Sequence, residues 1–155
     1  LARHAPACWL HYTAKMDKYR LVEERKRSED DTSDENNIRI TQQGKTRAYI
    51  LYSTRLLLEK DCKTIKLRAL GRAINKAVTV AEIVKRRVPD LHQITELSAV
   101  ELVDVYEPLE EGLDPVENTR HVSSISVTLS TLTLDTSNPG YQPPLPPEEV
   151  HEGPT

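Results

Sequence analysis

Hydrophobic and polar positions change their spacing several times along the chain, and each change predicts a new element. In residues 37–43 and 63–70, aliphatic residues alternate with polar ones, which is typical of strands with one buried face. Between them, residues 48–60 hold aliphatic residues at helical spacing, namely Ile50, Leu51, Leu57 and Leu58. We therefore expect a strand, a helix and a second strand over residues 37–70.

Residues 71–88 predict a second helix. At about 100° per residue, one arc of this helix is apolar: Ala73, Ala77, Val80, Ala81, Val84 and Val88, widened by Ile74 and Val78. Arg72, Lys76 and Arg87 share the opposite side, and Pro89 ends the helix. The helix is therefore expected to bury one face and expose a basic one.

Two long alternating stretches, residues 92–106 and 121–134, predict a hairpin joined by the acidic loop 107–120. The order of elements is then β-α-β-α-β-β. Strands connected through helices should be parallel, and the hairpin should add antiparallel strands. The expected fold class is α/β, a compact layer with both helices on one face.

Composition sets the expected boundaries of this domain at residues 36–134. Residues 1–35 are largely polar and are expected to be disordered, with residues 1–15, before the first Met, interpreted as an upstream extension or an artefact. Residues 135–155 are rich in Pro and are expected to form an extended or disordered tail. Because no run of 18 apolar residues occurs, we expect no membrane span.

Charge is divided unevenly along the chain. Residues 38–88 hold 13 Lys and Arg against 3 Asp and Glu, whereas residues 89–119 hold no Lys or Arg and 9 Asp and Glu. This asymmetry indicates either a face that binds a polyanion or a solvated surface whose halves attract each other. Cys8 and Cys62 lie far apart, which argues against a disulfide framework and favours a reducing compartment.

Two glycines each precede a predicted helix and are followed by a cation: Gly44 by Lys45, and Gly71 by Arg72. A helix start exposes unpaired N–H groups that suit a phosphate oxygen, and a neighbouring cation adds a charged donor. Cations at the start of a helix are misplaced for the helix dipole, whereas Lys85 and Arg86 at its end are explained by it. Each corner is either a phosphate site or a plain turn with solvent-facing cations.

Other chemistry is not supported by the sequence. A Walker-type phosphate loop would need Gly five positions before Gly44, where Arg39 stands. Tyr49 and Tyr52 either stack on unpaired bases or belong to the core or its boundary. The five histidines lack ligand spacing with the cysteines, so no metal or other cofactor is expected, and no catalytic arrangement is found, so no enzyme is expected.

The stretches "NIRITQQGKTRAYI", "GRAINKAVTVAEIVKRRVPDLHQIT", "TRHVSSISVTLS" and "GYQPPLPP" resemble the Alba superfamily, in particular plant-type Alba-like proteins related to ribonuclease P and MRP protein subunits. The resemblance covers roughly residues 36–147, and its most specific block is 71–78. It implies a fold similar to the C-terminal domain of translation initiation factor 3, homo- or heterodimers with another Alba-like chain, and binding to RNA and DNA in the nucleus and cytoplasm.

The resemblance also implies site residues. The basic loop after the first strand corresponds to Gly44, Lys45 and Arg47, and the start of the second helix to Gly71, Arg72 and Lys76. The last hairpin retains Arg120, and Arg87 joins the set because it shares the side of Arg72. The chain departs from the family at Thr46 and Leu70, where basic residues are common. The acidic hairpin loop favours RNA over DNA.

Two functions follow from these observations. The first is a dimeric, non-enzymatic nucleic-acid-binding protein that contacts the phosphate backbone. The second is a scaffold subunit of a ribonucleoprotein, such as a ribonuclease P/MRP-like assembly, that binds protein partners through the acidic region 89–119 and the "PPLPP" segment.

Overall fold

The computed structural model describes residues 19–26, 35–60 and 62–151. Within these residues the chain forms two compact units, a larger one with residues 35–99 and 122–151 and a smaller one with residues 19–26 and 100–121. The interpretation of residues 1–15 falls outside the described part. Among the described residues, no helix is long and apolar enough to cross a membrane.

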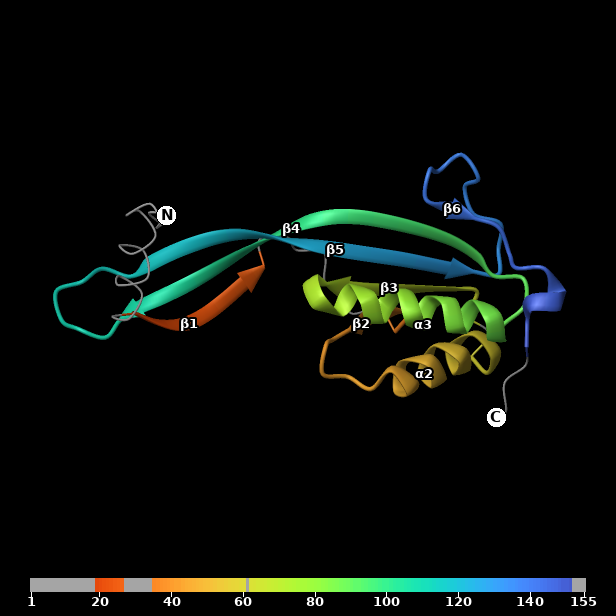
Figure 1. Cartoon of the computed structure of the whole chain (residues 1–155), viewed down its shortest axis with the longest axis horizontal. Coiled ribbons are helices and arrows are strands. Elements are labelled where there is room, and N and C mark those ends of the chain that lie inside the picture. Colours follow the sequence, from red (N-terminus) through yellow and green to blue (C-terminus); the bar gives the residue numbers. More distant parts are fainter. Residues whose placement is uncertain (1–18, 27–34, 61, 152–155) are drawn as a thin grey trace, which may run out of the picture. The chain divides into compact units, whose positions relative to one another are not determined.

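The larger unit is built on a mixed sheet (Figure 1). Strand β2 (Asn37–Ile40) runs parallel to β3 (Thr64–Leu70), and β3 runs antiparallel to β5 (Val116–Ser130). Strand β4 (His92–Pro108) lies next to β5 and carries the short strand β6 (Tyr141–Gln142) on its other edge. The predicted α/β class and the parallel pairing through a helix are therefore confirmed.

Two helices cover one face of this sheet (Figure 1). These are α2 (Thr46–Leu58) and α3 (Ile74–Arg87), the latter preceded by the short 3-10 helix η1 (Gly71–Ala73). The predicted apolar arc of the second helix is buried except at its widened margin, where Val78 is exposed and Ile74 is half-buried. The buried residues pack with alternate residues of β3 and β5: Ile65, Leu67, Ala69, Ile125, Val127 and Leu129. Because Leu67 and Val80 are fully buried, each stabilises the fold by roughly 1.5–3 kcal/mol relative to exposure.

The smaller unit contains β1 (Tyr19–Lys26), which pairs antiparallel with β4 from Tyr19 opposite Pro108 to Lys26 opposite Leu102. This strand lies within the segment 1–35 that the sequence predicts to be disordered. It is dense in charge and its partner is distant in sequence, so local pattern does not reveal it. Strands β4 and β5 also extend into the predicted loop 107–120 and leave only residues 109–115 as loop.

The C-terminal segment also differs from the expected tail over residues 135–151. The backbone N–H of Thr95 donates to the Gly140 carbonyl at 2.9 Å, and the N–H of His151 donates to the Arg86 carbonyl at 2.9 Å. Between them lie β6 and the 3-10 helix η2 (Pro147–Glu149). The edge of β4 and the last turn of α3 supply these backbone partners, which the Pro-rich composition does not indicate.

Candidate nucleic-acid interface

The two predicted basic turns emerge at the same edge of the sheet. Strands β2 and β3 are parallel, and their last paired residues are Ile40 and Ala69. The turn 41–45 follows the first of these strands, and the turn 70–72 follows the second. In open α/β sheets the carboxyl ends of parallel strands are the usual place for ligands. The fold thus brings together Gly44 and Gly71, which lie 27 positions apart in sequence.

The first turn leads directly into α2. Lys45 is the N-cap residue of this helix, no side chain caps the helix, and its first turn holds no acid. Lys45 and Arg47 are exposed. The positive end of the helix and two exposed cations therefore coincide, which is the electrostatic arrangement that stabilises an anion.

Tyr49 holds this turn in shape from within. Its hydroxyl accepts a hydrogen bond from the backbone N–H of Thr41 at 3.2 Å and shares another with Thr41 Oγ1 at 3.1 Å. The bond to the Thr41 side chain has the larger effect and the bond to the Thr41 backbone the smaller one, and both lower the pKa of Tyr49. A Cβ atom on Gly44 would overlap the Tyr49 ring, so any larger residue there would have to displace the ring. Of the two interpretations of Tyr49, its contacts favour a structural role in the turn.

The second turn begins α3 in a similar way. Gly71 has φ of +51°, which an L side chain rarely adopts, and a Cβ there would lie 3.3 Å from Val122 Cγ1. Leu70 is the N-cap of η1 without a side-chain cap, and neither η1 nor α3 has an acid in its first turn. Arg72 is exposed. This turn therefore repeats the combination of glycine, helix start and cation.

Lys76 connects the two turns. Its Nζ donates to the carbonyl oxygens of Gln42 and Gly44 at 2.6 Å each and to that of Thr41 at 3.3 Å. An ammonium group has three donors, and all three are accounted for by this turn. The sequence places Lys76 among the phosphate contacts. The structure places it as a brace that fixes the first turn against the first turn of α3.

The other end of α3 holds Arg87 and Lys85. Arg87 is half-buried, and at about 1.5 Å per residue it lies roughly 22 Å along the axis from Arg72, so the shared helical side does not bring the two together. Lys85 is buried and its Nζ donates to Gln142 Oε1 at 3.2 Å. Burial lowers the pKa of Lys85. The helix dipole alone therefore does not account for this lysine.

Arg120 belongs to the smaller unit and lies on β5, not in a loop. Its Nε donates to Oδ2 of Asp104 on the neighbouring strand at 2.7 Å, and the Asp104 side chain is only 6% exposed. A charge-assisted bond to a buried carboxylate is a structural contact of the hairpin. The structure therefore does not bring Arg120 into one unit with the basic turns.

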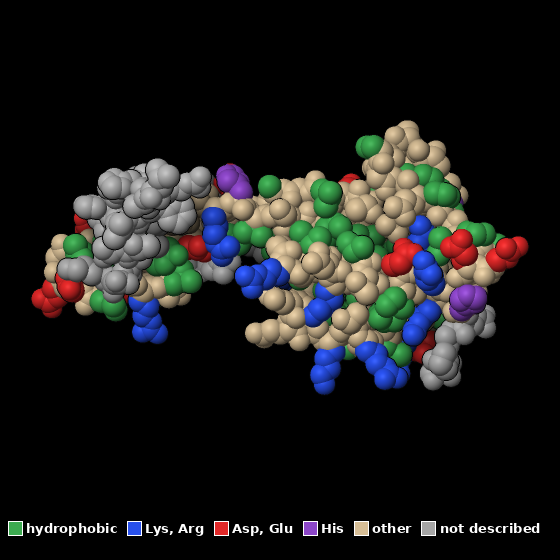
Figure 2. Space-filling view, in the orientation of Figure 1, with side chains coloured by type: hydrophobic (Ala, Val, Ile, Leu, Met, Phe, Trp, Pro, Cys, Tyr) green, Lys and Arg blue, Asp and Glu red, His purple; other side chains and the backbone are tan. Residues whose placement is uncertain are grey.

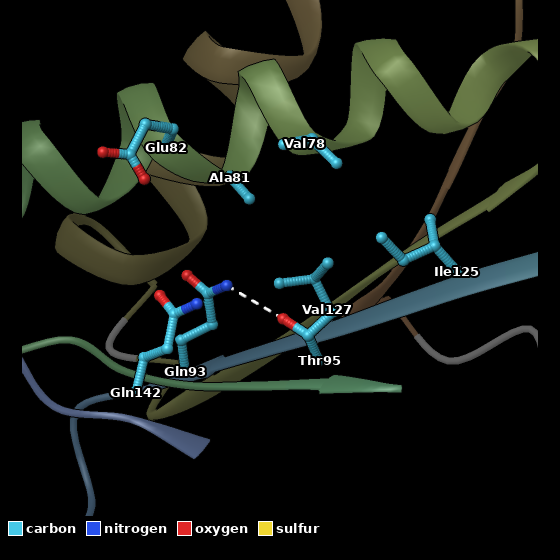
Figure 3. A pocket seen from close by; sticks show the side chains of 8 residues that line it. All are labelled: Val78, Ala81, Glu82, Gln93, Thr95, Ile125, Val127 and Gln142. Carbon is cyan, nitrogen blue, oxygen red and sulfur yellow. Dashed lines mark hydrogen bonds between the residues drawn. The ribbon is translucent and has the colours of Figure 1, made fainter. Parts of the chain in front are cut away.

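A separate pocket of about 200 Å³ lies between α3, β4, β5 and β6 (Figure 3). Its walls are apolar at Val78, Ala81, Ile125 and Val127. Gln93 points into it, donating from Nε2 to Thr95 Oγ1 at 2.9 Å, while its buried Oε1 has no hydrogen-bond partner. An unpaired buried amide oxygen is costly, so this pocket favours an incoming hydrogen-bond donor.

The distribution of charge follows the sequence asymmetry. In Figure 2, Lys and Arg side chains gather over the helical side of the larger unit, whereas acidic side chains gather at the hairpin loop of the smaller unit and around η2. Exposed acids of that loop region are Glu107, Glu110, Glu111, Asp114 and Glu117. The basic turns therefore belong to the positively charged part of the molecule.

Comparisons with known proteins show which family this chain resembles. The Alba family model matches residues 36–101. The chain is 42% identical over 119 residues to "DNA/RNA-binding protein ALBA1" of Plasmodium falciparum, covering 77% of this chain and 48% of that protein. It is 53% identical over 76 residues to "Ribonuclease P protein subunit p25-like protein" of Mus musculus, covering 48% and 47%. The chain thus spans about half the length of these relatives.

Among solved structures, Alba from Thermoplasma volcanium matches with a TM-score of 0.46 and 28% identity, over 61% of this chain and 99% of that one. The family match includes both basic turns, α2, α3 and the start of β4. Residues 36–101 therefore form an Alba domain, and the chain belongs to the Alba superfamily.

Proposed function

We propose that this protein binds RNA or DNA through the edge formed by the turns 41–45 and 70–72, without catalysing a reaction. The observation that carries the proposal is the parallel pairing of β2 and β3. This pairing places two helix N-termini, each preceded by a glycine, at the same edge of the sheet. Lys45, Arg47 and Arg72 contact phosphate oxygens there, together with backbone N–H groups of the two turns. Relatives named as DNA/RNA-binding proteins support this proposal.

Backbone contacts give affinity with little dependence on sequence. A phosphate presents the same oxygens whichever base it carries, so the three cations and the helix starts do not select a sequence. Lys76 acts indirectly, because its ammonium is engaged by the carbonyls of the first turn. Arg87 and Arg120 lie outside this surface and stay predictions from the sequence. We favour RNA over DNA because the hairpin loop is acidic.

A salt titration tests the phosphate contacts. Binding to single-stranded RNA, duplex RNA and duplex DNA is measured for the wild type, Lys45→Ala, Arg47→Ala, Arg72→Ala and the control Lys63→Ala. Lys63 is exposed and lies before the amino end of β3, at the opposite edge. Each site variant should reduce the slope of log affinity against log salt by about 0.7–0.9, and the control should not. Affinity that is independent of salt would exclude the proposed contacts.

We propose in addition that the protein acts as a dimer, in which a second Alba-type chain covers the face formed by α3 and β4. Leu97 is 75% exposed and Val78 is 50% exposed on this face. Leu97 shares the side of Gln93 and Thr95, since alternate strand residues point the same way. An exposed apolar patch beside an unsatisfied buried amide is typical of an interface.

Sedimentation equilibrium tests this dimer. Leu97→Asp should shift the protein to the monomer, because it places a charge in the proposed interface. Leu132→Asp is the matched control, since Leu132 is also exposed but lies after the end of β5. A monomeric wild type that forms no complex with another Alba-like chain would contradict the proposal.

A second candidate function is a scaffold subunit of a ribonucleoprotein, such as a ribonuclease P/MRP-like assembly. The acidic part of the region 89–119 in the smaller unit favours it, because exposed carboxylates suit basic protein partners. Co-purification of partners that survives nuclease treatment, together with no binding of the purified protein to naked RNA, supports this function. Partners lost with nuclease argue against it.

We also propose that the protein works in the nucleus and cytoplasm. The free thiol of Cys62 is compatible with a reducing compartment. A fluorescent fusion expressed at native level should show both locations. Exclusive accumulation in an oxidising compartment would contradict this proposal.

A further inference from the structure

The Pro-rich segment 143–147 reads Pro-Pro-Leu-Pro-Pro. Four prolines in five residues restrict φ and remove backbone donors, which favours the polyproline II conformation. In that helix of three residues per turn, Pro143 and Pro146 lie on one edge. The segment thus presents a P-x-x-P pattern, the spacing that aromatic-lined grooves recognise, and ends at Pro147, where the 3-10 helix η2 begins.

The structure presents this segment to solvent. Pro146 has φ of −61° and ψ of 145°, which are polyproline II values. Pro143, Pro146 and Pro147 are exposed, whereas Pro144 and Leu145 are half-buried. The edge formed by Pro143 and Pro146 is therefore available to a partner, while the inner side rests on the larger unit.

The segment is held at both ends. Before it, the Tyr141 hydroxyl lies 2.7 Å from His92 Nδ1 with the two rings stacked, and Gln142 pairs with Gln93 across β6 and β4. After it, the N–H of His151 donates to the Arg86 carbonyl. A segment anchored at both ends loses less conformational entropy on binding than a free peptide does. These anchors therefore distinguish it from an ordinary Pro-rich tail.

Charge narrows the choice of partner. Exposed Glu148 and Glu149 directly follow the segment. Of the cations in the adjoining last turn of α3, Lys85 is buried and Arg86 pairs with Glu82 at 3.1 Å, so the two glutamates carry the exposed charge next to the prolines. A groove that carries acidic residues beside its aromatic floor would be repelled, whereas one with a basic rim would be attracted.

We propose that residues 143–146, followed by the exposed Glu148 and Glu149, are a docking site for a protein domain that reads polyproline II through an aromatic groove with a basic rim. The site adjoins the last turn of α3 and the start of β4, at the opposite end of α3 from the turn 70–72 (Figure 1). The two surfaces share no residue, so nucleic acid and this domain bind at the same time. The protein then links a bound nucleic acid to a partner protein.

Calorimetric titration of the full chain tests this site with two purified probes: a WW domain with Lys or Arg beside its groove, and an SH3 domain with an acidic groove rim. The wild type should bind the WW domain saturably and more tightly than the SH3 domain. Pro143→Ala/Pro146→Ala should weaken WW binding at least tenfold, whereas Pro115→Ala, an exposed proline of the hairpin loop, should not change it. RNA binding should be equal in all these variants.

Two further variants separate the contribution of charge from that of the anchoring at the start of the segment. Glu148→Lys/Glu149→Lys should weaken WW binding and strengthen SH3 binding. Tyr141→Ala, which removes one anchor, should weaken WW binding several-fold while leaving the prolines intact. Absence of WW binding by the wild type, equal binding by the double proline variant, or preference for the SH3 domain would overturn the proposal without affecting the nucleic-acid surface.

Discussion

Replacing Lys76 by Met tests how the candidate interface is held in shape. The substitution removes the ammonium and keeps an unbranched apolar stem, so it deletes the donors to Thr41, Gln42 and Gly44 with little loss of packing. A hydrogen bond to a charged group is worth about 1.5–3 kcal/mol when shielded. Here only the bond to Gly44 is partly buried, and water can replace the others.

The expected loss is therefore that of about one shielded bond, roughly 2 kcal/mol in the free energy of unfolding. Urea denaturation of the wild type, Lys76→Met and the control Lys63→Met measures it. Because the turn loosens, affinity for RNA should fall as well. The salt slope should stay the same, since Lys76 makes no phosphate contact of its own in this arrangement.

The two measurements separate the possible roles of Lys76. An unchanged free energy of unfolding combined with a slope reduced by about 0.7–0.9 would mean that the ammonium contacts phosphate directly. That outcome would refute the structural role of Lys76 in the first turn and support the phosphate contact implied by the sequence.

Three more substitutions test other parts of the structure. Gly44→Ala should cost about 1–3 kcal/mol because its Cβ displaces the Tyr49 ring, and denaturation should show less than additive loss when it is combined with Tyr49→Ala; full additivity would contradict this contact. Lys85→Met should be neutral or stabilising near neutral pH. Burial lowers the pKa of Lys85 in the folded protein below 10.5, the value of the unfolded chain. Between the folded and the unfolded pKa the unfolded wild type therefore binds more protons, so the stability of the wild type should rise with pH in this interval and that of Lys85→Met should not. Equal pH profiles would contradict this. Arg120→Ala should cost about 1–3 kcal/mol, because it leaves the buried Asp104 carboxylate without this donor, and adding Asp104→Asn should recover part of that loss in thermal unfolding; no recovery would contradict the pairing.

The parts of the fold that the sequence predicts are those in which a side chain's surroundings follow from its spacing. Residues of β3 alternate between buried and half-buried positions, and the arc of α3 that includes Ala77 and Val84 forms the core. Strand β1 and the segment 135–151 make backbone hydrogen bonds to a distant partner strand or helix. Such bonds involve atoms common to all residues, so composition gives little sign of them.

The candidate site divides in the same way. The glycine and cation at each helix start are local features, and Gly44 and Gly71 could be identified from sequence. The angular position of a residue around a helix does not reveal which other segment contacts its side chain. It also does not reveal how far apart two residues lie along the helix axis. For this reason the sequence groups Lys76 with Arg72, although its ammonium is bound by carbonyls of the turn 41–44. It also groups Arg87 with them, although Arg87 lies at the other end of α3.

The pairing of β4 along its outer edge has a consequence for solubility. An uncovered edge strand offers its backbone to other molecules and promotes aggregation. Here β1 occupies this edge at residues 102–108, and β6 with Gly140 occupies it at residues 93–95. The short strand β6 thus prevents intermolecular sheet growth at the start of β4. A chain shortened before Asn138 would expose this unpaired strand edge to aggregation even if its Alba domain folded normally.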